Sequence, residues 1–260
     1  MKTTRRLKIR SFSPLFTAWL IVIIFFILWE LAVNIGNFPV YLLPAPGRIF
    51  STLFTNFEVY TSALLITTGE AVLGLAFGLS AGLLLASLLI LLPGLENGVM
   101  TLAILAKSTP LAAIAPLLTI WLGFGMLPKV IITAFMTFFP VLVNLLSGMQ
   151  RVDPAMLDQF RSWRANRFEI FIHLRLPGSL PFLFSALKIS APLALIGAVV
   201  AEWTGASGGL GRIMWLAYTN LNLPYLFAAI FVVSAVGMLI YGLLNWIEKR
   251  VVFWNLSSEE

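Results

Sequence analysis

Few residues in this chain have chemically reactive side chains. Only 11% of its 260 residues are charged and 60% are hydrophobic; it contains no cysteine and a single histidine, His173. A disulfide, a thiolate metal site and a cysteine nucleophile are therefore excluded, and one histidine without a second ligand does not predict a metal centre. The chain has no P-loop pattern, and its apolar runs hold no convincing pair of catalytic groups. The sequence therefore predicts no covalent chemistry.

The candidates that remain are ionisable residues in or beside long apolar runs, which are costly in lipid and are functional candidates by default. Lys107 precedes Ser108, Thr109 and Pro110, where proline predicts a helix break, so these four residues are expected to line a solute path. Two more ionisable residues are expected on the same path: Lys188, for which contact with a neighbouring helix is the alternative, and Glu202. Two others near the ends of runs are expected to extend to the membrane interface: Glu30 and Glu70.

Glu202 opens a glycine-rich segment that runs from Ala201 to Gly211. Four glycines fall within its last seven residues, a density that a stable helix does not tolerate. The segment is therefore expected to form a turn at the outer end of an apolar span. We expect Glu202 and Trp203 to be buried in protein there.

These residues are carried by apolar runs long enough to cross a bilayer, which takes about 20 residues. Lipid permits helices or closed barrels, and the runs are too long and too unalternating for barrel strands. The sequence therefore predicts an all-α polytopic membrane protein. Its six predicted transmembrane helices are 15–35, 63–92, 99–123, 129–149, 178–201 and 223–247.

Basic residues indicate the orientation of these spans. If the N-terminus is cytoplasmic, five basic residues fall in the N-terminal tail, five in the segment 151–177 and two in the C-terminal tail, against three outside: Arg48, Lys129 and Arg212. Cytoplasmic loops carry the excess of Lys and Arg, so both termini are predicted to be cytoplasmic. This clustering beside spans is typical of membrane topology and argues against nucleic-acid binding.

The second span carries small residues at every fourth position: Gly74, Gly78, Gly82 and Ala86. This spacing places them on one helix face, where another helix can approach closely. We expect that helix to belong to the same subunit rather than to a dimer partner. Prolines interrupt the third, fourth and fifth spans, and broken helices are tolerated where they line a cavity, which favours a transport protein.

A polar segment of residues 151–177 lies between the fourth and fifth spans. It carries five arginines, and the chain has no comparable acidic cluster. The segment is predicted to be a cytoplasmic loop that docks on a soluble partner.

The segment resembles the cytoplasmic-loop motif of a known protein family. That motif reads Glu-Ala-Ala, three residues, Gly, nine residues, Ile-x-Leu-Pro. Asp158-Gln159-Phe160 stands at Glu-Ala-Ala, Arg164 at the glycine and Leu174-Arg175-Leu176-Pro177 at the end. The family comprises the membrane-spanning permease subunits of binding-protein-dependent ABC importers. Four further segments resemble its nitrate, sulfonate, taurine and bicarbonate subfamily, which includes permeases for thiamine-precursor pyrimidines: 43–46, 110–125, 201–211 and 227–230.

The resemblance implies a type I ABC importer permease fold with residues 15–250 as the permease domain, between cytoplasmic tails 1–14 and 251–260. It implies that the loop forms two short helices in a groove of an ATPase subunit, which binds ATP-Mg, so that this chain needs no cofactor. It also implies that the chain lies in the inner membrane and that its other partners are an external binding protein and a second copy of the chain. The residues expected to dock are Asp158, Gln159, Phe160, Arg161, Ser162, Arg164, Ala165 and Arg167.

Arg164 departs from the family pattern. Because residues other than glycine avoid positive φ, arginine is expected to require a different turn there, and the partner ATPase is expected to present acidic groups. The alternatives are an ion-coupled secondary transporter, for which the chain lacks clear inverted repeats and a coupling carboxylate, and a membrane enzyme.

Overall fold

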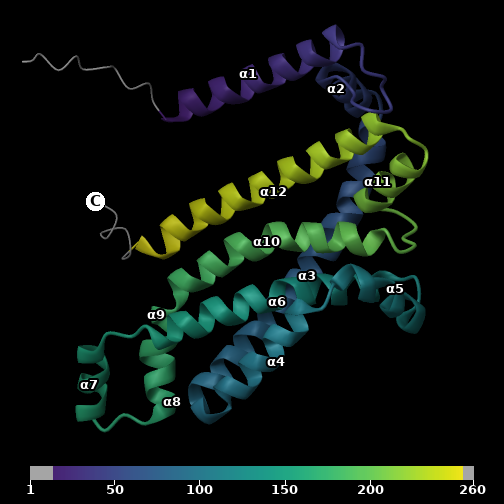
Figure 1. Cartoon of the computed structure of the whole chain (residues 1–260). Coiled ribbons are helices and arrows are strands. Elements are labelled where there is room, and N and C mark those ends of the chain that lie inside the picture. Colours follow the sequence, from purple (N-terminus) through teal and green to yellow (C-terminus); the bar gives the residue numbers. More distant parts are fainter. Residues whose placement is uncertain (1–13, 254–260) are drawn as a thin grey trace, which may run out of the picture.

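The computed structural model describes residues 14–253, and every regular element in that range is helical (Figure 1). The first half of the chain contains α1 (Pro14–Ile35), α2 (Pro46–Thr55), α3 (Phe57–Leu91), the 3-10 turn η1 (Pro93–Leu95), α4 (Glu96–Ser108), α5 (Leu111–Leu122) and α6 (Met126–Gln150). The second half contains α7 (Pro154–Ser162), α8 (Arg167–Ile170), the π-helix η2 (Phe171–Arg175), α9 (Leu176–Gly178), α10 (Leu180–Glu202), α11 (Leu210–Thr219) and α12 (Leu223–Val251). Most of the two predicted tails lies outside the described residues.

Five of these helices are long and apolar enough to cross a membrane: α1, α3, α6, α10 and α12. The third predicted span, 99–123, is not one continuous helix, which agrees with the break predicted at Pro110. It is the pair α4 and α5, bent by 95° at the break between them, so the count is six only if the pair is one broken span. The break has a local cause, because Pro110 disfavours the helical conformation of the residue before it, and Thr109 is extended with ψ 128°.

The centre of the fold is formed by α3, α6 and α10. The small residues of α3 face α6, as the spacing predicts. Atoms added at Gly74 would collide with Thr133, and atoms added at Gly78 would collide with Thr137. The close approach within one subunit is therefore confirmed, and it leaves no room for larger side chains along this face of α3.

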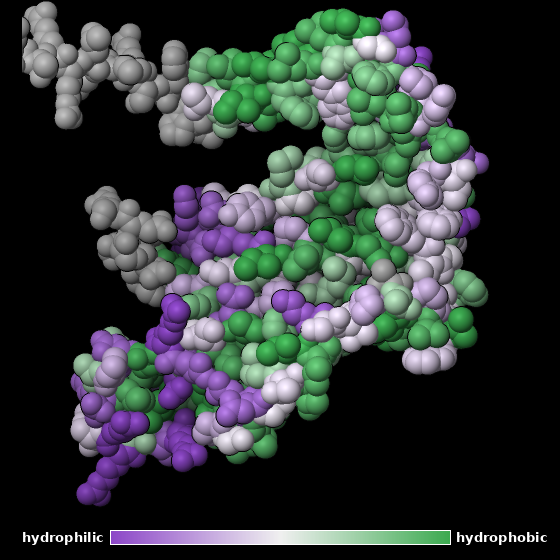
Figure 2. Space-filling model, in the orientation of Figure 1, coloured by the Kyte–Doolittle hydropathy of each residue, from purple (hydrophilic) through white to green (hydrophobic). Residues whose placement is uncertain are grey.

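The molecule has two chemically different ends. At one end α7 and α8 project beyond the end of α6 and the start of α10 (Figure 1). Hydrophilic residues gather on this projection, whereas hydrophobic residues dominate much of the visible helix surface (Figure 2). The polar segment 151–177 is thus held apart from the apolar body, and the opposite end is formed by the turn after α10 and the first turn of α11.

Candidate functional site

The first helix of the loop, α7, begins with a strong local signal. The side chain of Asp153 accepts a hydrogen bond of 2.9 Å from the backbone N–H of Ala155, and Pro154 occupies the first helical position. An aspartate cap followed by proline is a favoured way to start a helix. The sequence of the loop therefore defines this helix without help from the membrane body.

Arg164 ends α7 with a positive φ of 58°, so the expected change of turn is wrong. The N–H of Arg164 donates to the carbonyl of Arg161 at 2.9 Å, and the N–H of Ala165 donates to the carbonyl of Phe160 at 3.0 Å. Two bonds of this pattern around a left-handed residue form a Schellman cap, in which glycine is the usual residue. The turn keeps the glycine conformation, and arginine adopts it.

The second helix of the loop starts with a capping box. The Asn166 side chain accepts from the N–H of Glu169 at 2.9 Å, and the Glu169 carboxylate accepts from the N–H of Asn166 at 2.6 Å. The helix continues through the π-helical turn towards α10. Arg175 donates to the carbonyl of Met149 at 3.1 Å, which fixes the loop to the end of α6.

Of the eight residues expected to dock, six are exposed on this projection, and Phe160 and Ala165 are half-buried. Asp158 and Arg161 form an ion pair of 3.2 Å in which both side chains stay mostly exposed, so it contributes little stability. Phe160 packs against Trp163 with ring centroids 5.5 Å apart. The sequence analysis missed four large apolar side chains exposed on the loop: Met156, Trp163, Phe168 and Ile172. The signal was clearest at Trp163 and Phe168, each of which has polar or charged neighbours on both sides in the sequence.

Lys107 ends α4 beside α6, with its ammonium 4.5 Å from the centre of the Phe139 ring. Phe139 lies 13 residues after Met126 and 11 before Gln150, so at about 1.5 Å per residue it is roughly 17–20 Å from either end of α6. Lys107 therefore lies beside the middle of α6, which is one of the helices long enough to cross a membrane. It is exposed, as are the three residues that follow it: Ser108, Thr109 and Pro110.

Lys188 lies elsewhere, on the part of α10 that faces α12. Its ammonium is 2.6 Å from the carboxylate of Glu248, and the two side chains are about one fifth exposed. The structure brings it to a neighbouring helix, which was the second of the two expectations for this residue. It does not bring Lys188 together with Lys107.

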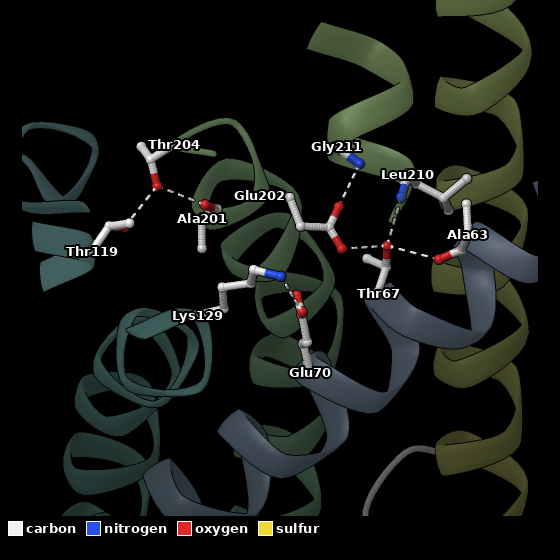
Figure 3. A network of polar contacts seen from close by, with 10 residues as sticks. All are labelled: Ala63, Thr67, Glu70, Thr119, Lys129, Ala201, Glu202, Thr204, Leu210 and Gly211. Carbon is white, nitrogen blue, oxygen red and sulfur yellow. Dashed lines mark hydrogen bonds and ion pairs between the residues drawn. The ribbon is translucent and has the colours of Figure 1, made fainter. Parts of the chain in front are cut away.

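Glu202 is fully buried, as expected, and joins α10 to α3 and α11 (Figure 3). The Thr67 hydroxyl donates to Glu202 at 2.7 Å, and the backbone N–H of Gly211 donates to its other oxygen. The turn after α10 has positive φ at Gly205 and Gly209, so the expected glycine turn is present. Trp203 is 45% exposed, which corrects the expectation that it is buried.

Glu70 and Lys129 lie beside Glu202 and correct two further expectations (Figure 3). Glu70 does not extend to an interface: it is 2% exposed and accepts from Lys129 at 2.6 Å. Lys129 is not a loop residue, because it lies in the first turn of α6 and is 8% exposed. Neither position signals the partner in sequence, since 59 residues separate them.

Comparison with known proteins agrees with this architecture. The family model for the inner membrane component of binding-protein-dependent transport systems matches residues 74–253, and the chain belongs to that family. A "Probable ABC transporter permease protein" of Haemophilus influenzae is 32% identical over 96% of this chain and 100% of its own length. The formylaminopyrimidine transport permease protein of Halalkalibacterium halodurans is 31% identical over 88% and 92% of the two chains.

A putative aliphatic sulfonates transport permease protein of Bacillus subtilis is 28% identical over 89% of this chain and 85% of its own. These relatives support the subfamily of nitrate, sulfonate and taurine permeases. Among solved structures, the methionine ABC transporter MetNI in an inward-facing conformation has a chain that matches with a TM-score of 0.67 at 17% identity, over 76% of this chain and 98% of that chain. The fold is therefore that of type I importer permeases, and the chain is a multi-pass membrane permease subunit.

Proposed function

We propose that this permease imports a small solute by alternating access, driven by an ATPase that docks on residues 151–177. In this proposal two copies of the chain form the path, and two cytoplasmic ATPase subunits bind ATP-Mg. A periplasmic or lipid-anchored binding protein delivers the solute, and both termini of the permease are cytoplasmic. The chain itself has no ATPase activity.

The observation that carries the docking assignment is the self-contained loop. Its two helices are capped by their own residues, project from the body and expose Met156, Trp163 and Phe168 between charged side chains. Exposed aromatic side chains surrounded by arginines are typical of interface hot spots. The hydrogen bond from Arg175 to Met149 connects the loop to α6, so a movement of the loop would be transmitted to the membrane helices.

The solute path is assigned to the face that carries Lys107. An ammonium at half depth costs about 2.5–3.5 kcal/mol when it faces lipid, and the carbonyls freed by the break at Pro110 add to that cost. Both costs are avoided if a second copy and a water-filled path cover this face. Lys188 and Glu202 remain proposed path residues, although their charges are engaged by Glu248 and by the Thr67 network within one subunit.

A lysine on the path favours an anion. A sulfonate, nitrate or taurine-like solute would pair with Lys107, whereas a neutral pyrimidine of the thiamine-precursor kind would gain only a hydrogen bond. The relatives named for formylaminopyrimidine and aliphatic sulfonates keep both solute classes as candidates.

The docking assignment is tested by charge reversal with a matched control. Arg161→Glu changes an exposed arginine on the loop, and Arg48→Glu changes an exposed arginine on α2, which is proposed to face outwards. Loss of an interface hot spot of about 2–4 kcal/mol predicts a roughly 30- to 1000-fold weaker hold on the ATPase for Arg161→Glu alone. The measurement is co-purification of the co-expressed ATPase, together with solute uptake by proteoliposomes. Phe168→Ala is a second loop variant. If the ATPase co-purifies with both loop variants as well as it does with the native chain, the assignment is refuted.

A further inference from the structure

Three buried ionisable side chains meet at the end of the molecule opposite the loop (Figure 3). Glu70 of α3, Lys129 of α6 and Glu202 of α10 are 2%, 8% and 0% exposed. From Lys129 to Gln150, α6 runs 21 residues, or roughly 32 Å, before it reaches the loop. The cluster is therefore remote from the docking surface, and the proposed function does not use its charge.

The formal charges of the three groups do not balance. Two carboxylates and one ammonium sum to one excess negative charge in a buried place, and an uncompensated buried charge is strongly destabilising. The next basic residue along the chain, Arg212 of α11, is half-exposed and makes none of the salt bridges found among residues 14–253. α11 contributes backbone N–H groups instead, and α5 contributes the Thr119 hydroxyl, which bonds Thr204.

Glu202 has the hydrogen-bond pattern of an ionised carboxylate. Each of its oxygens accepts a hydrogen bond, one from the Thr67 hydroxyl and the other from the N–H of Gly211 in the first turn of α11. Thr67 also accepts from the N–H of Leu210 at 2.8 Å, and the carbonyl of Ala63, at 3.1 Å, is a second and longer acceptor for its proton (Figure 3). The N-terminus of a helix favours negative charge, so Glu202 is well placed to remain ionised.

Glu70 has a different pattern. One oxygen accepts from Lys129 at 2.6 Å, but the other is buried without a donor, and the carboxyl group of Glu202 lies beside it (Figure 3). Two ionised carboxylates are both acceptors and cannot bond each other. One proton on the free oxygen of Glu70 would give that oxygen a hydrogen bond to make and cancel the excess charge.

We propose that the site formed by Glu70, Glu202 and Lys129 binds one proton, held on Glu70 and donated to Glu202. The bound proton makes the site neutral and ties α3, the start of α6 and the end of α10 to the first turn of α11. Gly209 and Gly211 lie directly against the Glu202 carboxylate, so there is no space for a larger residue or a bulkier cation on that side.

The proposal predicts that replacement by glutamine has different effects at Glu70 and at Glu202. In Glu70→Gln the amide oxygen accepts from Lys129 and the amide N–H donates to Glu202, which reproduces the protonated carboxyl group. In Glu202→Gln the amide NH2 must face either the Gly211 N–H, where two donors meet, or the Thr67 hydroxyl. In the second case Thr67 exchanges its 2.7 Å bond to the carboxylate for the longer bond of 3.1 Å to the Ala63 carbonyl. Glu58→Gln, at an exposed position in the first turn of α3, is the matched control.

The test uses the purified full-length chain in lipid nanodiscs at neutral pH. We expect the infrared carbonyl band of a buried protonated carboxylic acid in the native chain and in Glu58→Gln, and its loss in Glu70→Gln. Thermal unfolding should be unchanged for Glu70→Gln, whereas Glu202→Gln should lower the midpoint by at least about 5 °C or fail to fold. A band that survives in Glu70→Gln, or a Glu70→Gln chain that is destabilised or unfolded, would overturn the proposal.

Discussion

Replacing Arg164 by glycine should stabilise the turn that joins the two loop helices. Arg164 has a φ of 58°, and a left-handed conformation costs a residue with a side chain roughly 1–2 kcal/mol. Glycine avoids that steric cost but loses more conformational freedom on folding, which takes back about 0.5–1 kcal/mol. The expected net gain is therefore about 0.5–1 kcal/mol, or a two- to fivefold more stable turn.

The assay must separate backbone strain from the loss of the arginine charge. Arg164→Ala removes the same charge but keeps the strain, so Arg164→Gly is compared with Arg164→Ala rather than with the native chain. The local probe is hydrogen exchange of the Ala165 amide, which donates to the carbonyl of Phe160 at 3.0 Å. Its exchange should be about two- to fivefold slower in Arg164→Gly. Equal exchange in the two variants would refute the reasoning that the turn is strained.

Three further predictions follow from the packing, the path and the orientation. Gly78→Ala should destabilise the chain by about 1–3 kcal/mol in thermal unfolding, because the new atom would lie 2.6 Å from the carbonyl of Ala134, whereas Gly98→Ala meets nothing within 4 Å and should not. Lys107→Met should reduce solute uptake while leaving assembly with the ATPase intact; normal uptake would remove Lys107 from the path. A reporter active only in the periplasm should be silent when fused after residue 160 and active near residue 206, and the reverse pattern would overturn the predicted orientation.

Composition and periodicity were sufficient for much of the fold. Long uncharged runs permit only helices in lipid, and the four-residue spacing from Gly74 to Ala86 can create a close contact only on a helix. The two loop helices were implied by the family resemblance, and the structure shows that they start at local capping signals, Asp153-Pro154 and the pair Asn166 and Glu169. Each of these features depends on residues that are near one another in the chain.

Arg164 shows where a local rule gave the wrong result. The rule that side chains avoid positive φ concerns one residue, whereas the Schellman cap gains two hydrogen bonds from the flanking residues. The rule was applied to Arg164 alone, and the structure keeps the turn around it. The third span shows a similar limit, because Pro110 predicted a break but not the 95° bend that separates α4 from α5.

The sequence by itself determined that this protein is a bundle of membrane helices with an arginine-rich loop, since lipid and local hydrogen bonding leave little choice of structure. Tertiary structure alone decided that Glu70, Lys129 and Glu202 share one buried site. Lys129 follows Pro128 at the start of an apolar run, so it looked like a loop residue, and Glu70 looked like a residue near an interface. Their pairing across 59 residues depends on the packing of α3 against α6, which no local pattern encodes.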